Sequence, residues 1–411
     1  MTLIRVDHDL DFSPLHQCMQ HYVDQDLLAC ASTLVMRGTD LLDYRVFGRM
    51  DKESDKPLTE DAIYRMASNT KIVTSVALMM LYEQGKFALD DELSRYLPEF
   101  GRQQVLLPDA KTIDDVEEAK SPILIRHILS HTAGFSYGFV EPDSLIDRSY
   151  MGGGLNLFGD TDFDLDLEEF CQRLSTMPLA YHPGTSWRYS FATDVCARLV
   201  EVLSGMKFDA FLRANIFTPL GMVDTAFWVT PEKTDRLITL YSPKDFLDPS
   251  QPGMTRGDEP KTGQFSKAPA FLSGGGGLVS SMSDYVTFLR MIINDGEWQG
   301  TRLLKPETIA LMRTNQLAPG VSVAFPMWAM PGTVFGLGFA LKQTLQPDDH
   351  SGAQNEYYWG GLYGTHSWMA PEAGITGMCS TQRMPGFWHP FSHDFRRMAY
   401  DIAAPADDHA S

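Results

Sequence analysis

The stretch Tyr64-Arg65-Met66-Ala67-Ser68-Asn69-Thr70-Lys71, which runs into the apolar residues 72–81, decides how this chain is interpreted. The apolar run predicts a helix, and a helix places Ser68 and Lys71 one turn apart on the same face. A serine hydroxyl is a weak nucleophile near neutral pH and needs a base within hydrogen-bonding distance. Lysine can be that base only if burial or nearby positive charge lowers its pKa. The pair therefore predicts a nucleophile and its base at a helix N-terminus, where free backbone amides suit an oxyanion.

Ser-x-x-Lys also arises by chance, with the serine as a helix cap and the lysine in solvent. A second copy, Ser204-Gly205-Met206-Lys207, follows the helical pattern of residues 195–203. Gly205 is typical of a helix end, where the helix dipole has the wrong sign for an oxyanion. We expect this second copy to be structural.

Composition limits the classes of function. The chain has 411 residues, 44% hydrophobic and 21% charged, which is typical of a globular protein with room for two subdomains. A net charge of -19 argues against nucleic-acid and anionic-membrane partners. The sequence has no signal-peptide pattern and no run as long as a membrane span, so we expect a cytoplasmic protein. Five scattered cysteines indicate reduced thiols and no zinc knuckle; they are Cys18, Cys30, Cys171, Cys196 and Cys379.

Strand-like segments lie at both ends of the chain, and helical patterns dominate its middle. The expected strands are residues 29–36, 42–47, 63–66, 334–341, 361–370 and 374–381. The expected helices include residues 14–24, 167–177, 193–203, 208–217, 283–293, capped by Ser283 or Asp284, and 391–403. We therefore expect an α/β fold (α+β) whose sheet subdomain comprises residues 1–85 and 271–411, with part of 121–140. Residues 86–270 would form a mostly helical inserted subdomain.

A Ser-Lys pair explains only half of an acyl transfer, because the leaving group must also be protonated. Tyr189 is the best candidate, since it lies in a turn between Pro183-Gly184 and the helix expected near Thr193. A tyrosine facing a protonated lysine is stabilised as phenolate, so the two groups could share one proton. The alternative is that Tyr189, one of 15 tyrosines, is simply a boundary aromatic.

Five ordered motifs together resemble the serine β-lactamase-like superfamily, and most closely the family VIII carboxylesterases, which share the class C β-lactamase fold. They are Tyr64 to Lys71, His131-Thr132-Ala133-Gly134, Pro183-Gly184 before Tyr189-Ser190, Gly276-Gly277-Leu278-Val279-Ser280, and Trp359-Gly360-Gly361. The resemblance implies an antiparallel sheet flanked by helices. It also implies Ser68 as nucleophile, Lys71 as base and Tyr189 as acid and base. The oxyanion hole would be the backbone amides of Ser68 and Leu362, the latter at the end of an edge strand.

Two departures from the β-lactamase pattern bear on the substrate. Tyr189-Ser190-Phe191 replaces Tyr-x-Asn, and Trp359-Gly360-Gly361 replaces the Lys-Thr-Gly whose cation holds a substrate carboxylate. Both changes favour a neutral, apolar ester over an anionic antibiotic. A literal Lys261-Thr262-Gly263 lies in the irregular connection 242–270, and we expect Lys261 on the surface.

Residues beside these motifs are candidates for substrate binding: Tyr137, Phe191, Asp194, Trp359, Gly360 and Gly361. The aromatic members predict an apolar pocket. Asp194 could equally be a charge at the start of a helix, and His366 could face the cleft or serve a structural role.

Other motifs carry less weight. Gly134-Phe135-Ser136-Tyr137-Gly138 matches the Gly-x-Ser-x-Gly sequence of a nucleophile elbow, which requires a strand, a turn and then a helix. Ser136 instead follows an expected helix and a turn, so we expect it to be a loop serine. The possible metal-binding patterns lack essential ligands; they are His127/His131, His389/His393 and Asp160/Asp162/Asp164. We expect no metal and no cofactor.

The sequence therefore predicts a serine hydrolase that cleaves small-molecule carboxylic esters, with a short acyl part, through an acyl-Ser68 intermediate. A β-lactamase, a D-amino-acid peptidase or amidase, and an acyltransferase are the alternatives within the same chemistry. A non-catalytic ligand-binding protein is a remote alternative, since it would need none of the three catalytic side chains. The oligomeric state stays open.

Overall fold

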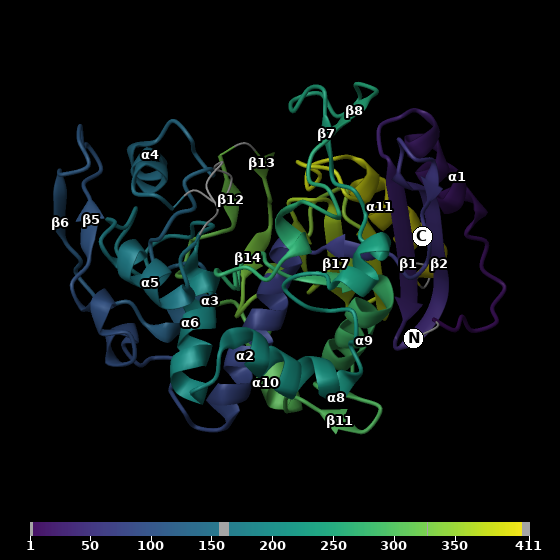
Figure 1. Ribbon diagram of the computed structural model, residues 1–411. Coiled ribbons are helices and arrows are strands. Elements are labelled where there is room, and N and C mark those ends of the chain that lie inside the picture. Colours follow the sequence, from purple (N-terminus) through teal and green to yellow (C-terminus); the bar gives the residue numbers. More distant parts are fainter. Residues whose placement is uncertain (1–2, 156–163, 327, 405–411) are drawn as a thin grey trace.

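The computed structural model describes residues 3–155, 164–326 and 328–404, so Asp160 and Asp162 lie outside the described residues. Figure 1 shows a large sheet with helices on both faces and, beside it, a mainly helical part that carries α3 to α6. This arrangement confirms the expected α/β fold with an antiparallel sheet and flanking helices. The proposed subdomain boundaries stay a prediction.

Eight strands form one antiparallel sheet in the order β14-β15-β16-β17-β18-β1-β2-β3. Their bounds are β1 Cys30–Arg37, β2 Asp40–Asp51, β3 Lys56–Pro57, β14 Thr333–Phe335, β15 Ala340–Lys342, β16 Tyr357–Gly361, β17 Thr365–Ala370 and β18 Ile375–Ser380. β1 pairs with β18 from Ser32 opposite Ser380 to Arg37 opposite Ile375. The two ends of the chain therefore meet in the middle of the sheet.

Helices cover both faces of the sheet, which explains why its central strands β1, β17 and β18 are almost continuously buried. Along β1, Leu34 and Met36 belong to the core shared with α2 and α9, whereas Ala31 and Val35 pack with α1 and α11. The helices are α1 Ser13–Asp24, α2 Thr70–Glu83, α3 Ile125–Leu129, α4 Leu145–Gly152, α5 Leu167–Ser175, α6 Ala192–Ser204, α7 Phe208–Leu212, α8 Thr218–Leu220, α9 Met282–Ile293, α10 Pro306–Met312 and α11 Phe391–Ala403.

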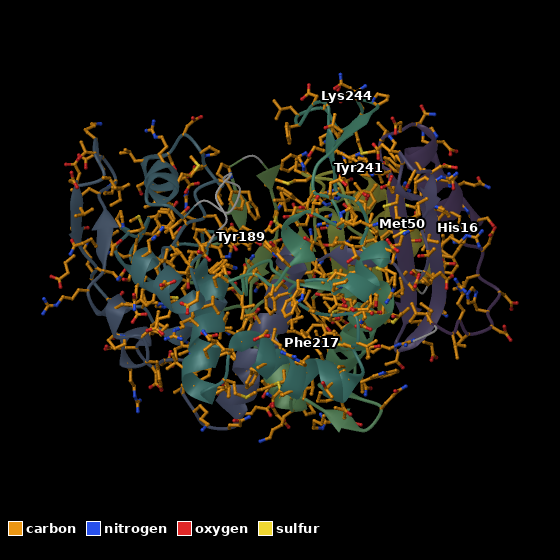
Figure 2. The ribbon with its side chains drawn as sticks, viewed as in Figure 1. His16, Met50, Tyr189, Phe217, Tyr241 and Lys244 are labelled. Carbon is orange, nitrogen blue, oxygen red and sulfur yellow. The ribbon has the colours of Figure 1, made fainter. Side chains whose placement is uncertain are left out.

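Short strand pairs lie outside the large sheet. They are β4 Ile63–Arg65 with β9 Val279–Ser281, β5 Gln104–Leu106 with β6 Val116–Glu118, β7 Tyr241–Pro243 with β8 Met254–Arg256, β10 Glu297–Trp298 with β11 Thr301–Arg302, and β12 Ala324–Phe325 with β13 Trp328–Ala329. In Figure 2, Lys244 marks the outer end of the β7–β8 pair, whereas Tyr189 lies among packed side chains near β12. No helix in the described part of the chain is both long and apolar enough to cross a bilayer.

Four expectations about elements were wrong in detail. Residues 334–341 form two strands, because the chain turns at Gly338, whose φ is +96°. Residues 361–370 contain a turn in which Gly364 has φ +81°, so β16 ends at Gly361 and β17 begins at Thr365. β16 is an interior strand, not an edge strand. Finally, α9 is capped by Ser281, whose hydroxyl accepts the Asp284 backbone amide.

Candidate active site

The turn that carries Ser68 is fixed from two sides. It is a 3-10 turn, Ala67–Asn69, between β4 and α2, and Ala67 has φ +46°, a strained value for a residue with a side chain. The Thr365 hydroxyl donates to the Met66 carbonyl at 2.8 Å, and the side-chain amide of Asn69 donates to the Thr365 carbonyl at 3.0 Å. The sheet therefore holds the backbone on both sides of Ser68.

Lys71 lies in the first turn of α2 with only 2% of its surface exposed. Its Nζ donates to Ser68 Oγ at 3.2 Å and to the Gly275 carbonyl at 2.6 Å. Burial lowers the pKa of Lys71 to about 7, although the negative charge of Asp194 acts in the opposite direction. A substantial fraction of Lys71 is therefore neutral near pH 7 and able to accept the Ser68 proton.

Tyr189 lies just before α6 and contacts both members of the pair. Its hydroxyl is hydrogen-bonded with Ser68, and Lys71 Nζ lies 4.6 Å from its ring centroid. Trp359 Nε1 donates to the Tyr189 oxygen at 3.1 Å. Burial raises the pKa of Tyr189 above its usual value, and the hydrogen bonds with Ser68 and Trp359 counteract part of that rise.

Asp194 is fully buried in α6 and is linked to Lys71 by hydrogen bonds through residues 273–277, which contain four glycines. Its Oδ1 accepts the Ser273 hydroxyl at 2.7 Å and the Gly275 backbone amide at 2.9 Å. The carbonyl of the same glycine accepts the Lys71 amine. Burial raises the pKa of Asp194, while the Lys71 charge lowers it. The negative charge of Asp194 therefore favours the protonated form of Lys71 and opposes part of the effect of burial.

His131 is a packing residue in this site. It is buried, its ring centroid lies 5.0 Å from that of Tyr189, and its Nδ1 lies 3.2 Å from Ser190 Oγ. Burial, and then the Lys71 charge, hold the pKa of His131 well below its usual value, so the ring is neutral. No cluster of three or more metal-ligating side chains occurs in residues 3–155, 164–326 and 328–404.

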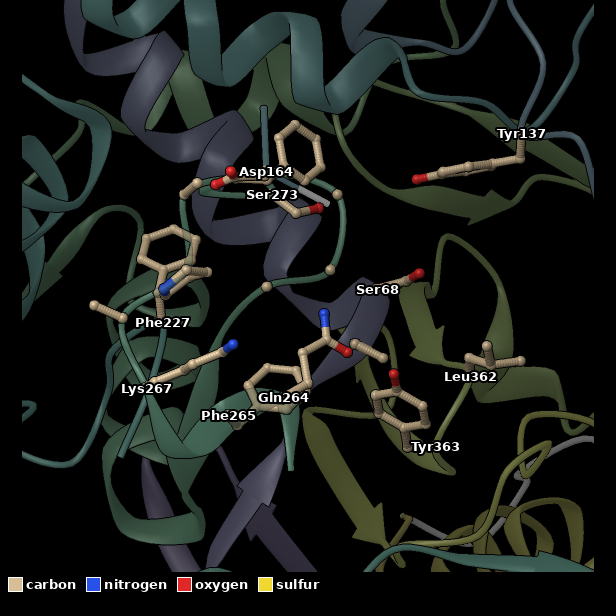
Figure 3. A pocket seen from close by; sticks show the side chains of 18 of the residues that line it. Ser68, Tyr137, Asp164, Phe227, Gln264, Phe265, Lys267, Ser273, Leu362 and Tyr363 are labelled. Carbon is tan, nitrogen blue, oxygen red and sulfur yellow. The ribbon is translucent and has the colours of Figure 1, made fainter. Parts of the chain in front are cut away.

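A pocket of about 350 Å³ opens beside Ser68 (Figure 3). Ser68 and Leu362 both line it, so the residues expected to form the oxyanion hole lie at the same cavity. The end of β16 approaches the nucleophile turn so closely that a Cβ added at Gly361 would lie 3.1 Å from the Ala67 Cβ. Figure 3 shows the Ser68 side chain between Tyr137 on one side and Tyr363 on the other.

Of the six expected substrate-binding residues, only Tyr137 lines this pocket. Trp359 and Phe191 are buried, Trp359 against Tyr189 and Phe191 against Tyr137, with ring centroids 5.2 and 4.6 Å apart. Asp194 is buried beside the glycines, and Gly360 and Gly361 belong to β16. None of these five residues lines the pocket; Trp359 contacts Tyr189, and the charge of Asp194 acts on Lys71.

His366 and Lys261 lie away from the reacting groups. The His366 ring packs against Phe391 of α11, with centroids 5.8 Å apart, and burial lowers the pKa of His366 to about 4. The Lys261 side chain is 76% exposed, with Asp235 3.7 Å away. The literal Lys-Thr-Gly is therefore a surface feature, as its surroundings in the sequence indicate.

Ser136 is not placed as a nucleophile. Ser136 is fully buried. Its hydroxyl donates a hydrogen bond to Asp147 and accepts one from Arg188 Nε at 2.7 Å. Arg188 also donates to Asp147 at 2.9 Å. The three side chains tie the residues next to Tyr137 and Tyr189 together, which is a positioning role.

Sequence reasoning missed the wall of the pocket. Most of it comes from the connection after residue 258, which lines the cavity with Gln264, Phe265, Lys267, Ala268, Pro269, Ala270, Phe271, Ser273 and Gly275 to Gly277. Asp258 anchors the start of this wall, because it accepts Arg65 Nε at 2.8 Å and the Gln264 backbone amide at 2.8 Å. Two phenylalanines within a stretch rich in Pro and Gly were the signal available in the sequence.

Comparison with known proteins identifies relatives over nearly the whole chain. The Beta-lactamase family model matches residues 15–399. Esterase EstB of Burkholderia gladioli is 31% identical over 386 residues, which cover 89% of each chain. Acyltransferase calJ of Penicillium decumbens is 29% identical over 80% of this chain and 78% of its own. The solved structure of EstCE1, described as a hydrolase with promiscuous acyltransferase activity, has 26% identity and a TM-score of 0.79 over 94% of this chain and 97% of its own.

Proposed function

This chain belongs to the β-lactamase family, and we propose that it acts as a serine carboxylesterase of the family VIII type. The observation that carries the proposal is the contact of the Ser68 hydroxyl with both Lys71 and Tyr189 at the edge of an apolar pocket. The likeness to an esterase over most of both chains supports it.

In the acylation half, Ser68 Oγ attacks the ester carbonyl while its proton passes to Lys71 or Tyr189. The negative charge develops on the carbonyl oxygen, where the backbone amides of Ser68 and Leu362 stabilise it. The bond from the carbonyl carbon to the alcohol oxygen then breaks. The departing oxygen takes the proton back from Tyr189, which leaves an ester between the acyl group and Ser68.

The deacylation half repeats these steps with water. Tyr189 and Lys71 accept a proton from the water as its oxygen attacks the acyl carbonyl. The bond to Ser68 Oγ breaks, Ser68 recovers its proton, and the carboxylic acid leaves. Because Lys71 has a pKa of about 7, it exchanges protons near neutral pH without a large penalty in either direction.

Trp359 supports an ester over a β-lactam substrate. A β-lactam antibiotic carries a carboxylate, and Lys-Thr-Gly supplies a cation for it in the class C pattern. Here the side chain at that place is a buried indole whose N–H is directed to Tyr189, so it offers no charge to an anion.

Acyl transfer to an alcohol is a second candidate. The likeness to calJ and to EstCE1, both described with acyltransferase activity, favours it. The acyl-Ser68 intermediate is common to both reactions, and only the acceptor in the second half differs. Adding a primary alcohol to an ester assay and measuring the ratio of new ester to free acid separates the two.

A paired assay tests the proposed function. Wild type and Ser68→Ala are assayed with p-nitrophenyl acetate and with nitrocefin. We expect cleavage of the acetate ester that is lost in the variant, and little cleavage of nitrocefin. Dominant nitrocefin cleavage would instead assign the protein to the β-lactamases.

We also propose a reducing, cytoplasmic location, which agrees with the five unpaired thiols.

A further inference from the structure

We infer that the pocket beside Ser68 accepts a bulky, ring-bearing, apolar acyl group in preference to the short acyl chain expected from the sequence. The inference rests on the proposed esterase function and names the substrate class of that site. It depends on three features of the described residues: the side of Ser68 on which the pocket lies, its size, and the chemistry of its walls.

The position of the general acid decides which part of the ester the pocket holds. Tyr189 must reach the oxygen of the leaving alcohol, yet neither Tyr189 nor Lys71 lines the pocket. Both are buried behind Ser68, whereas Leu362 of the oxyanion hole lies at the pocket itself. The alcohol therefore departs on the tyrosine side, and the remaining substituent of the carbonyl carbon, the acyl group, extends into the pocket.

The size of the pocket exceeds what a short acyl chain can fill. Its volume is about 350 Å³. Cavities of roughly 300 Å³ and above hold drug-sized ligands. An acetyl or butanoyl group would leave most of this volume to water and most of the apolar wall in contact with it, so binding would gain little from the pocket.

The walls of the pocket suit a flat apolar group. Among the residues that the structure describes, six aromatic side chains line it: Tyr137, Phe139, Phe227, Phe265, Phe271 and Tyr363. Gly275 to Gly277 form a part of the wall that has no side chains. A ring can approach such a backbone closely, and aromatic rings pack on one another edge to face or offset. The pocket also has polar members, which Figure 3 labels: Asp164, Gln264 and Lys267 are exposed, and Ser273 is half-buried.

The pocket is built to remain open. Arg65, which is fully buried, binds Asp258 with its Nε, and its guanidinium carbon lies 5.5 Å from the Phe265 ring centroid. Asp258 in turn accepts the Gln264 backbone amide. On the other wall, Phe271 packs against Phe170, with ring centroids 4.6 Å apart. These anchors hold the irregular connection in place, so the aromatic wall is preformed and does not depend on the substrate.

The test compares p-nitrophenyl 3-phenylpropanoate with p-nitrophenyl acetate. For each ester, kcat/KM is divided by its rate of hydroxide-catalysed hydrolysis, which removes the difference in intrinsic reactivity. In wild type we expect the phenylpropanoate to be preferred by about tenfold or more, a size typical of one or more apolar groups entering a matching pocket. A preference for the acetate would overturn the inference.

Ala268 lines the pocket and is exposed, so Ala268→Trp places a large side chain in the pocket without disturbing buried packing. We expect it to reduce the preference for the phenylpropanoate by about tenfold. Thr262→Trp is the matched control, because Thr262 is exposed on the same connection but does not line the pocket. It should leave the preference unchanged. An unchanged preference in Ala268→Trp would overturn the inference, and Ala270→Trp repeats the test if that variant is unstable.

Failure of this inference differs from failure of the proposed function. If no ester is cleaved in a Ser68-dependent way, the esterase function itself is wrong. If the acetate is cleaved through Ser68 but the phenylpropanoate is not preferred, the function holds and the assignment of the pocket is wrong.

Discussion

Replacing Trp359 by phenylalanine should slow the reaction by removing one hydrogen bond to Tyr189. Trp359 Nε1 donates to the Tyr189 oxygen at 3.1 Å, in a site where both rings are buried. The bond gains strength when Tyr189 gives up its proton and its oxygen carries negative charge. The indole therefore stabilises the form of Tyr189 that accepts a proton from Ser68 or from water.

The magnitude follows from the type of bond. A hydrogen bond to a charged group contributes about 1.5–3 kcal/mol. Because each 1.36 kcal/mol corresponds to a tenfold change in rate, loss of the bond should lower kcat by about 10- to 150-fold. The effect should appear in kcat and in kcat/KM alike, since Trp359 does not line the pocket and the interaction strengthens during the reaction.

Trp187→Phe is a closely matched control. Trp187 and Trp359 are each 6% exposed and both pack against Tyr189. The Trp187 Nε1, however, has no hydrogen-bond partner among the described residues. The same loss of volume should therefore change kcat by less than about threefold, as expected for packing without a lost bond to a charged group. Melting temperatures of both variants report the shared cost of packing.

Equal losses of kcat in Trp359→Phe and Trp187→Phe would refute this reasoning, because ring packing alone would then explain them. A rise in KM at unchanged kcat in Trp359→Phe would refute it as well. That result would return Trp359 to a role in substrate binding.

Three further predictions concern charge. Asp194→Asn removes the negative charge that raises the pKa of Lys71. In a profile of kcat/KM against pH, the acid limb is expected near pH 7 in wild type and should move to lower pH in this variant. A shift to higher pH would contradict this reasoning. Lys71→Met should raise the melting temperature more at about pH 6 than at about pH 9. The folded pKa of Lys71 lies below its unfolded value of 10.5, so the cost of the buried charge is complete below about pH 7 and disappears towards pH 10.5; an equal rise at both values would argue against a buried amine. Asp258→Ala leaves the buried Arg65 without its carboxylate and should cost about 3 kcal/mol in urea unfolding; Arg65→Met in the same chain should recover part of this loss if the buried charge is its cause.

The sequence predicted best what depends on neighbours along the chain. Ser68 and Lys71 are three residues apart, and the 3-10 turn that runs into α2 brings their side chains to a 3.2 Å contact. The strands near both ends follow from apolar runs between turn residues. The inner position of β16 could not be predicted, because strand order depends on pairings such as Gly361 with Thr365 and Tyr357 with Met369.

What the sequence did not predict depends on contacts between distant segments. Trp359 and Tyr189 are 170 positions apart, and no periodicity links them. The wall from Gln264 to Gly277 is mostly irregular, so neither a helical nor a strand pattern marks it. Its position depends on the buried Arg65 and its partner Asp258, a pairing that only the folded chain displays.

The most direct test of the central claim is to locate the covalent adduct formed by a fluorophosphonate, which reacts with activated serines. The protein is treated, digested and mapped by mass spectrometry, with Ser68→Ala and Ser136→Ala treated in parallel. The account predicts an adduct on the peptide that contains Ser68, present in Ser136→Ala and lost in Ser68→Ala. An adduct on Ser136, or labelling that persists in Ser68→Ala, would contradict it.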